Sequence, residues 1–120
     1  MVDIPNTWAG DVVRRWLDTR VEAARLDQAT ADKRGHAAQD DYDKAAAEEW
    51  VCRNLKAGNF ADDQIAFAGR VKELLGQGEY HTTGIHDNRR FERHVRENLR
   101  KIAKMAKAND GFANTLRYQR

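Results

Sequence analysis

The sequence predicts an all-α fold, a small helical bundle of about four helices with a short C-terminal turn. Ala, Arg, Asp, Glu and Lys dominate the composition while Val, Ile and Thr are sparse, and this balance favours helix over strand. The single proline, Pro5, precedes the first apolar stripe, so proline interrupts no later segment. Apolar residues also recur at helical spacing along most of the 120 residues, a length that fits one domain spanning residues 1–120.

The first helix is expected from Trp8 to about Gln28, with Asn6 or Thr7 as its N-cap. Its apolar residues cover a wide arc, which suits a helix that contacts two neighbours, within the chain or in a homodimer. Gly35 is expected to break or bend the chain near residues 33–35, because an interior glycine costs about 1 kcal/mol relative to alanine. One edge of the arc supplies the candidate oligomer interface: Trp8, Val12 and Trp16.

Two further helices are expected in the middle of the chain. The second covers residues 37–56 and is rich in alanine, which allows close helix approach. The third is capped by Asn59 or Asp62 and ends at the Gly-Gln-Gly of residues 76–78. We expect the second helix to pack against the first and the third. Residues 79–86 lack helical periodicity and are predicted to form a loop, or at most a short extended piece.

The segment from residue 87 to residue 107 predicts a strongly amphipathic last helix that closes the bundle, with Asp87 or Asn88 as its N-cap. Glu97 is the only acidic residue within its basic arc. One side of this helix is an apolar stripe: Phe91, Val95, Leu99, Ile102 and Ala106. The opposite side, here called the basic ridge, is the predicted partner-binding surface: Arg89, Arg93, Arg96, Arg100, Lys104 and Lys107.

The charge distribution supports a binding role for this last helix. The net charge of the chain is only +2, yet residues 81–120 carry ten basic and four acidic side chains, whereas residues 1–80 carry eleven basic and fifteen acidic ones. Arginines at helical spacing can neutralise the phosphates of a nucleic acid, or contact an acidic protein surface. The alternatives are a solvated face on a surface helix, or a docking site for the acidic N-terminal region of another copy. No helix-turn-helix is indicated, since the connection before the basic helix is far longer than the turn of that motif.

The histidines and acids indicate catalysis only weakly, and we predict no cofactor, no metal ligand and no catalytic residue. His86-Asp87 resembles the histidine–aspartate pair of metal phosphohydrolases, which use further ligands on separate helices. With His81 nearby, the spacing matches no standard metal pattern. The acids between Asp40 and Glu49 loosely resemble the acid arrays of all-α nucleotide pyrophosphohydrolases, but the second acidic pair is missing, so we expect a solvated face.

The composition and the N-terminus also limit the cellular locations and the kinds of catalysis that this sequence allows. Cys52 is the only cysteine, which excludes an intrachain disulfide and fits a reducing cytoplasm. Serine is absent, so there is no serine nucleophile, and no glycine-rich phosphate loop is present. The N-terminus lacks the features of a secretion signal, and no apolar stretch approaches the roughly 20 residues that span a bilayer. We expect a cytoplasmic protein without a membrane partner.

These observations predict a non-enzymatic binding or regulatory module whose basic C-terminal helix engages an acidic partner, either a protein surface or a nucleic acid. Small bacterial or phage proteins that regulate or inhibit larger machines share this size and composition. One alternative is a structural subunit of a larger assembly, in which the ridge is a protein contact. A second is a small metal-dependent hydrolase that uses His81, His86 and Asp87.

Overall fold

The computed structural model describes residues 8–107. In that range it contains helices and no strand, which confirms the all-α class. The predicted caps Asn6 and Thr7 and the predicted C-terminal turn lie outside the described residues. The first helix starts at Gly10 with Ala9 in the N-cap position, so the predicted start at Trp8 is wrong by two residues and neither Asn6 nor Thr7 is its cap. Four α-helices and two short 3-10 helices follow one another: α1 (Gly10–Arg34), η1 (Gly35–Ala38), α2 (Gln39–Lys56), η2 (Phe60–Asp62), α3 (Gln64–Gln77) and α4 (Asn88–Lys107).

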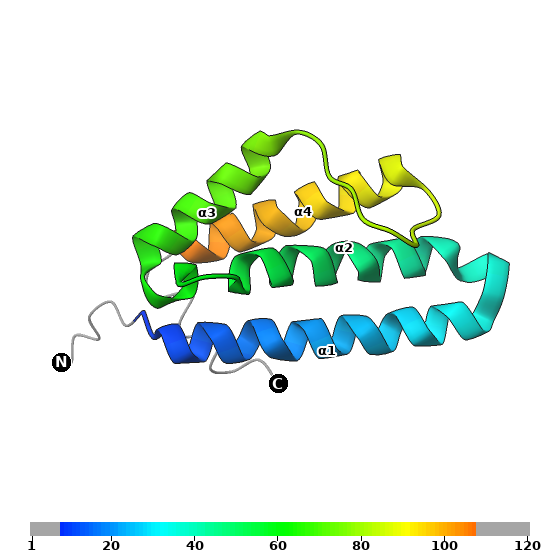
Figure 1. Cartoon of the computed structure of the whole chain (residues 1–120), viewed down its shortest axis with the longest axis horizontal. Helices are drawn as coiled ribbons and strands as arrows, with labels where there is room; N and C mark the ends of the chain where they lie inside the picture. Colours follow the sequence, from blue (N-terminus) through cyan, green and yellow to red (C-terminus); the bar gives the residue numbers. More distant parts are fainter. Residues whose placement is uncertain (1–7, 108–120) are drawn as a thin grey trace.

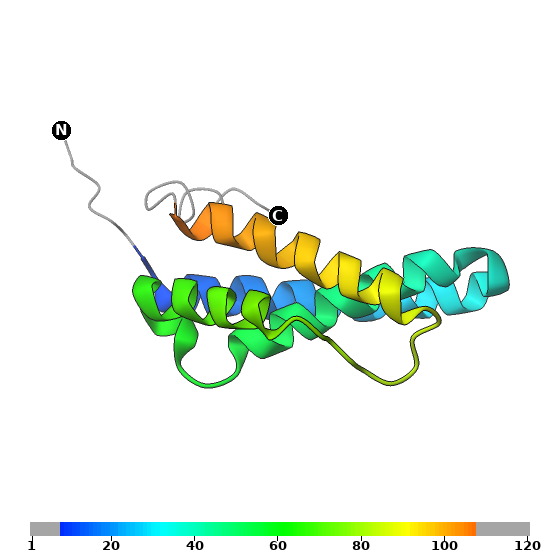
Figure 2. The ribbon, with the colours of Figure 1, turned by 90° about the horizontal axis from the view of Figure 1, so that it is seen from above.

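Successive α-helices run in opposite directions, and α2 lies between α1 and α4 (Figure 1). α1 packs along α2, as the sequence predicts. The predicted contact between the second and third helices is slight, because α3 packs mainly on α4 and η2. The view from above shows α4 crossing over the pair formed by α1 and α2 (Figure 2). In the described part, the backbones of α1 and α4 do not approach each other closely, so α2 connects them.

α1 is longer than the sequence predicts and continues through the polar segment 29–34. Two features support this extension: Ala31 is buried, and Lys33 and Arg34 complement the negative end of the helix dipole in the last turn. Gly35 then ends the helix with φ of 77°, a backbone conformation that strains any residue with a side chain. The break predicted near residues 33–35 is therefore confirmed.

The start of α3 differs from the prediction by one residue. Asp63 caps this helix, since its carboxylate accepts a hydrogen bond from the Ala66 backbone N–H at 2.9 Å. Asn59 is instead the N-cap of the short η2 helix and Asp62 is its last residue, so both lie before the start of α3. The predicted end is confirmed, because α3 stops at Gln77.

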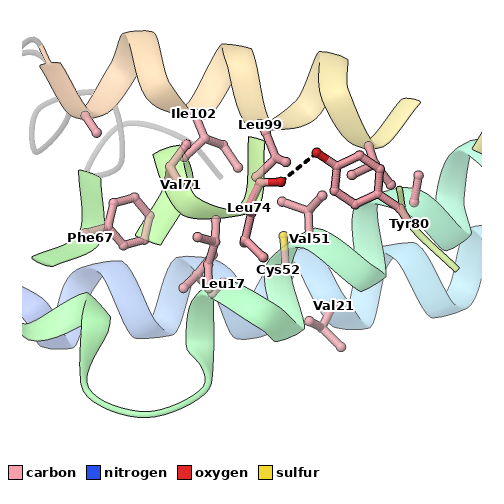
Figure 3. Close-up of a cluster of buried hydrophobic side chains, with 14 of the residues drawn as sticks. Leu17, Val21, Val51, Cys52, Phe67, Val71, Leu74, Tyr80, Leu99 and Ile102 are labelled. Carbon is pink, nitrogen blue, oxygen red and sulfur yellow. Dashed lines mark hydrogen bonds between the residues drawn. The ribbon is translucent and has the colours of Figure 1, made fainter. Parts of the chain in front are cut away.

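The hydrophobic core collects buried side chains from all four α-helices, including Leu17, Val51, Phe67 and Leu99 (Figure 3). Tyr80 joins them from the loop that connects α3 to α4, and its hydroxyl donates a hydrogen bond to the Leu74 carbonyl oxygen at 2.6 Å. This aromatic contribution to the core was not predicted. The predicted apolar stripe of α4 is confirmed, since all five of its members are buried: Phe91, Val95, Leu99, Ile102 and Ala106.

Candidate functional site

The basic ridge forms the outward side of α4. The side chains of Arg89, Arg93, Arg100 and Lys104 are exposed, and Arg96 is half-buried. Lys107 is the last residue of the helix, and its side chain lies outside the described part. Successive ridge residues are three or four positions apart, so at 1.5 Å per residue their backbone positions recur about every 4.5–6 Å along the axis. The result is a straight row of cations.

Most cations outside the ridge are paired with acids on other helices or one turn away. Examples are the pairs Arg20–Glu48, Arg34–Asp41 and Arg70–Glu73. On the ridge the structure shows a single such pair among the described residues, Arg93 with Glu97 at 3.9 Å. The outward side of α4 therefore carries positive charge that the described part of the chain does not compensate.

Arg96 differs from the other ridge residues because part of its side chain is used within the fold. Its guanidinium donates a hydrogen bond to the Gly78 carbonyl oxygen at 3.0 Å. The same group lies 5.6 Å from the centre of the Tyr80 ring, within the range of a cation–π contact. Arg96 therefore holds the chain that follows α3 against α4, a role that the sequence did not reveal.

A buried carboxylate determines where α4 begins. Asp43 of α2 is fully buried, with 0% exposure. Its Oδ1 accepts a hydrogen bond from the His86 N–H at 2.8 Å, and its Oδ2 accepts one from the Asp87 N–H at 2.9 Å. The Arg90 guanidinium donates a third, also at 2.9 Å. Charge-assisted bonds of this kind are the strong ones, so Asp43 fixes the end of the loop and the first turn of α4 to α2.

The expectation that the acids of α2 form a solvated face is therefore wrong at Asp43. The hydrogen bond and charge of that carboxylate hold the pKa of Arg90 above its usual value. Asp40, one turn earlier, lies 3.1 Å from the Arg90 Nε and 3.4 Å from the Nε2 of the nearly buried His94. Arg90 and His94 thus face the acids of α2 and lie apart from the ridge.

Asp87 caps α4, as predicted. Its carboxylate accepts a hydrogen bond from the Arg90 backbone N–H at 3.1 Å, and this bond holds the pKa of Asp87 below its usual value. The cap carries a negative charge at the positive end of the helix dipole, where the charge is stabilising. The start of α4 is therefore fixed from both sides, by its own cap and by the carboxylate of α2.

The three residues of the hydrolase alternative do not assemble a metal site. The His81 side chain is exposed, the His86 ring packs edge-on against Tyr42 at 5.2 Å, and the Asp87 carboxylate is occupied as the cap. Over residues 8–107 no three His, Cys, Asp or Glu side chains gather where they could hold a metal ion. Nor is any helix of that part long and apolar enough to cross a membrane.

A groove of about 490 Å³ runs between α1 and α2 and was not expected. Its lining includes Arg20, Glu48, Arg34 and Asp41, which pair with each other in the two ion pairs described above. A smaller hollow of about 170 Å³ continues toward the apolar side chains of Trp16, Ile102 and Met105. Because the charges in the larger groove are mostly paired with one another, it presents no strong field to a charged ligand.

The candidate oligomer residues Trp8, Val12 and Trp16 are half-buried and pack against the core of their own chain. The Trp8 indole N–H donates a hydrogen bond to the Ala61 carbonyl oxygen at 2.9 Å, and its ring lies 5.3 Å from that of Phe67. Trp8 therefore serves the fold itself, by fastening the start of the described chain to η2 and α3.

Comparisons with models of protein families, with curated proteins and with solved structures find no match.

Proposed function

We propose that this protein is a non-enzymatic binding module whose basic ridge engages the phosphate backbone of a nucleic acid. The observation that carries the proposal is an exposed, straight row of cations with little acidic compensation, on a helix whose position is fixed by buried contacts. A cytoplasmic location belongs to the proposal, and it suits Cys52, a free and buried thiol.

The ridge weakens the helix that carries it. Like charges four residues apart destabilise a helix by about 0.2–0.5 kcal/mol for each pair, and the ridge has three such pairs: Arg89–Arg93, Arg96–Arg100 and Arg100–Lys104. The first turn contains no acidic residue, so Arg89 also opposes the positive end of the dipole. A local conflict of this kind, without a structural gain, is expected at a functional surface.

Arginine predominates in the row, and its planar guanidinium binds phosphate better than the ammonium group of lysine does. A straight row with one charge every 4.5–6 Å can follow the phosphates of one strand. Contacts to phosphates do not depend on the base sequence. An acidic protein surface offers the same sign of charge without that regular spacing. We therefore favour nucleic acid, and an acidic protein is the other outcome of the test.

The test is fluorescence anisotropy of labelled duplex DNA, single-stranded DNA and RNA at about 50 and about 200 mM salt. We expect binding that collapses as salt rises. In a ridge variant with glutamine at Arg89, Arg93, Arg100 and Lys104, the slope of log K against log salt should fall by up to about 0.9 for each lost phosphate contact. Arg96 is left in place because it bonds to Gly78.

The matched control removes the same charge elsewhere, with glutamine at four exposed basic residues on α1, α2 and α3: Arg15, Lys33, Lys44 and Lys72. This control should keep most of the affinity and most of the salt slope. Equal loss in both variants would mean that only net charge matters. Absence of binding by the natural chain at low salt would overturn the nucleic-acid proposal.

A further inference from the structure

α1 carries two stripes of uncharged residues. One is buried in the described structure, and the other packs against the core only at its N-terminal end, through Val12 and Trp16. The first is buried against α2 and contains Val13, Leu17, Val21, Ala24 and Ala31. The second, here called the open seam, lies about 135° away around the helix axis, at 100° per residue. It contains no charged residue: Val12, Trp16, Thr19, Ala23, Leu26 and Thr30.

Most of the open seam is in contact with solvent. Thr19, Ala23, Leu26 and Thr30 are exposed, and the Leu26 side chain is 68% exposed, an unusual value for a large apolar residue. α1 forms one edge of the molecule, with α2 along its inner side (Figure 1). Apart from Ala29, the exposed residues of α1 outside the seam are charged, so the open seam is a distinct uncharged strip; Ala23 and Thr30 also line the groove between α1 and α2.

The spacing within the open seam identifies the kind of partner it fits. Its six members follow one another at intervals of four, three, four, three and four residues. This alternation is the heptad spacing with which two helices pack side chains into one another's gaps. It predicts that the seam is covered by another helix running along α1.

We propose that this helix is α1 of a second copy, and that the two α1 helices pack antiparallel in a homodimer. The flanks of the seam carry the argument: Arg15 and Glu22 lie on one side, Arg20 and Asp27 on the other. In a parallel pair, a residue on one flank faces the residue five positions later on the opposite flank of the partner. Arg15 would then face Arg20, and Glu22 would face Asp27, so both contacts would bring like charges together. In an antiparallel pair, each flank faces the same flank of the other copy.

In the antiparallel arrangement Arg20 of each copy, which also pairs with Glu48 of its own chain, lies opposite Asp27 of the other, so the complementary contact occurs twice across the two-fold axis. Asp27 is exposed, and it has no ion-pair partner in the described part of its own chain. Thr19 then faces Ala23 near the axis, where small side chains allow close approach. Leu26 meets Trp16, whose indole is half-buried in its own chain.

The first test is the molar mass in solution, measured by sedimentation or light scattering over a concentration series. The chain has a mass of 13.8 kDa, and we expect about twice that value at high concentration. Leu26→Glu should give the monomer with unchanged helical circular dichroism. The matched control is Ile65→Glu on α3, because Ile65 is also large, apolar and 81% exposed but lies off the seam. This control should stay dimeric.

The orientation is tested with Asp27→Arg. In the antiparallel dimer this change sets two arginines against each other and should raise the dissociation constant several-fold. In a parallel dimer it would place an arginine beside Glu22 and tighten association. A natural chain that stays monomeric at every concentration overturns the proposal. So does a dimer that survives Leu26→Glu, one that is lost with Ile65→Glu, or one that tightens with Asp27→Arg.

Discussion

Asp43 is the single residue on which the position of the basic helix most depends. It is fully buried, and its two carboxylate oxygens satisfy two backbone N–H groups of the loop end and the Arg90 guanidinium. Removing the Asp43 charge leaves two backbone N–H groups short of an acceptor and leaves Arg90 with only the exposed Asp40 as a partner, and a loss of this kind costs far more than the ion pair itself contributes.

Asp43→Asn should therefore lower the free energy of unfolding by about 3–5 kcal/mol, measured by urea denaturation. The control is Asp41→Asn, which removes an exposed acid two residues away that pairs with Arg34 at 3.0 Å. That change should cost at most about 1 kcal/mol. Similar losses in the two variants would show that the buried network at Asp43 does not stabilise the fold as described.

Cys52 is a buried thiol whose protonation should be visible in its reactivity. Burial raises its pKa from 9.0 to about 12, with a further contribution from the charge of Glu48, while Arg20 opposes the shift. Only the thiolate is nucleophilic, so Ellman's reagent should label the native protein far more slowly than the urea-unfolded protein at pH 8. Equal labelling rates would contradict the burial.

The same shift gives a pH dependence of stability. Between pH 9 and about 12 the unfolded thiol loses its proton while the native thiol keeps it, so the unfolded state binds fewer protons. The free energy of unfolding should then fall as pH rises through this window. Cys52→Ala should lack this component of the slope while keeping that of the other titrating groups.

At the scale of one element, α4 combines a core-facing side that stabilises the fold with an outward side that weakens it. If the ridge exists for binding, the ridge variant should be more stable than the natural chain at low salt. The expected gain is about 0.2–0.5 kcal/mol for each like-charge pair removed, and salt should reduce it by screening. Thermal unfolding at two salt concentrations measures this.

The variant at Arg15, Lys33, Lys44 and Lys72 is again the comparison, and it should show no such gain. A lower melting temperature for the ridge variant would instead indicate that the four ridge side chains make stabilising contacts.

Leu99 lies on the core-facing side of the same helix, where a substitution should have the opposite effect on stability. It is fully buried, so truncation to alanine should cost about 2–5 kcal/mol.

The four α-helices could be predicted from the sequence to different degrees, for a physical reason. α4 was predictable because its apolar and basic residues separate cleanly at helical period. The continuation of α1 through residues 29–34 was not, because this segment has few apolar side chains and depends on Ala31 packing against neighbouring structure. Contacts made by the loop, such as those of Tyr80 with Leu74 and Arg96, require a chain path that periodicity does not contain.

At the scale of the whole molecule, the composition was enough to predict the fold class. Which helices pack against each other was harder to predict. The hairpin of α1 and α2 follows from their order, whereas the preference of α3 for α4 depends on how the long loop returns. A signal for Asp43 was present in the sequence, since it lies four and eight residues before the buried Ala47 and Val51. Its position on that apolar side indicated a buried carboxylate.

The joint between Asp43 and the start of α4 also has a consequence for how this chain can evolve. Asp43 ends the loop and, together with Asp40, compensates Arg90, so a change at position 43 leaves backbone N–H groups unpaired and a change at position 90 leaves a buried carboxylate without its cation. Variation in lineages descended from this chain should therefore be concentrated on the outward side of α4. The residues at 43 and 90 should be replaced together or not at all.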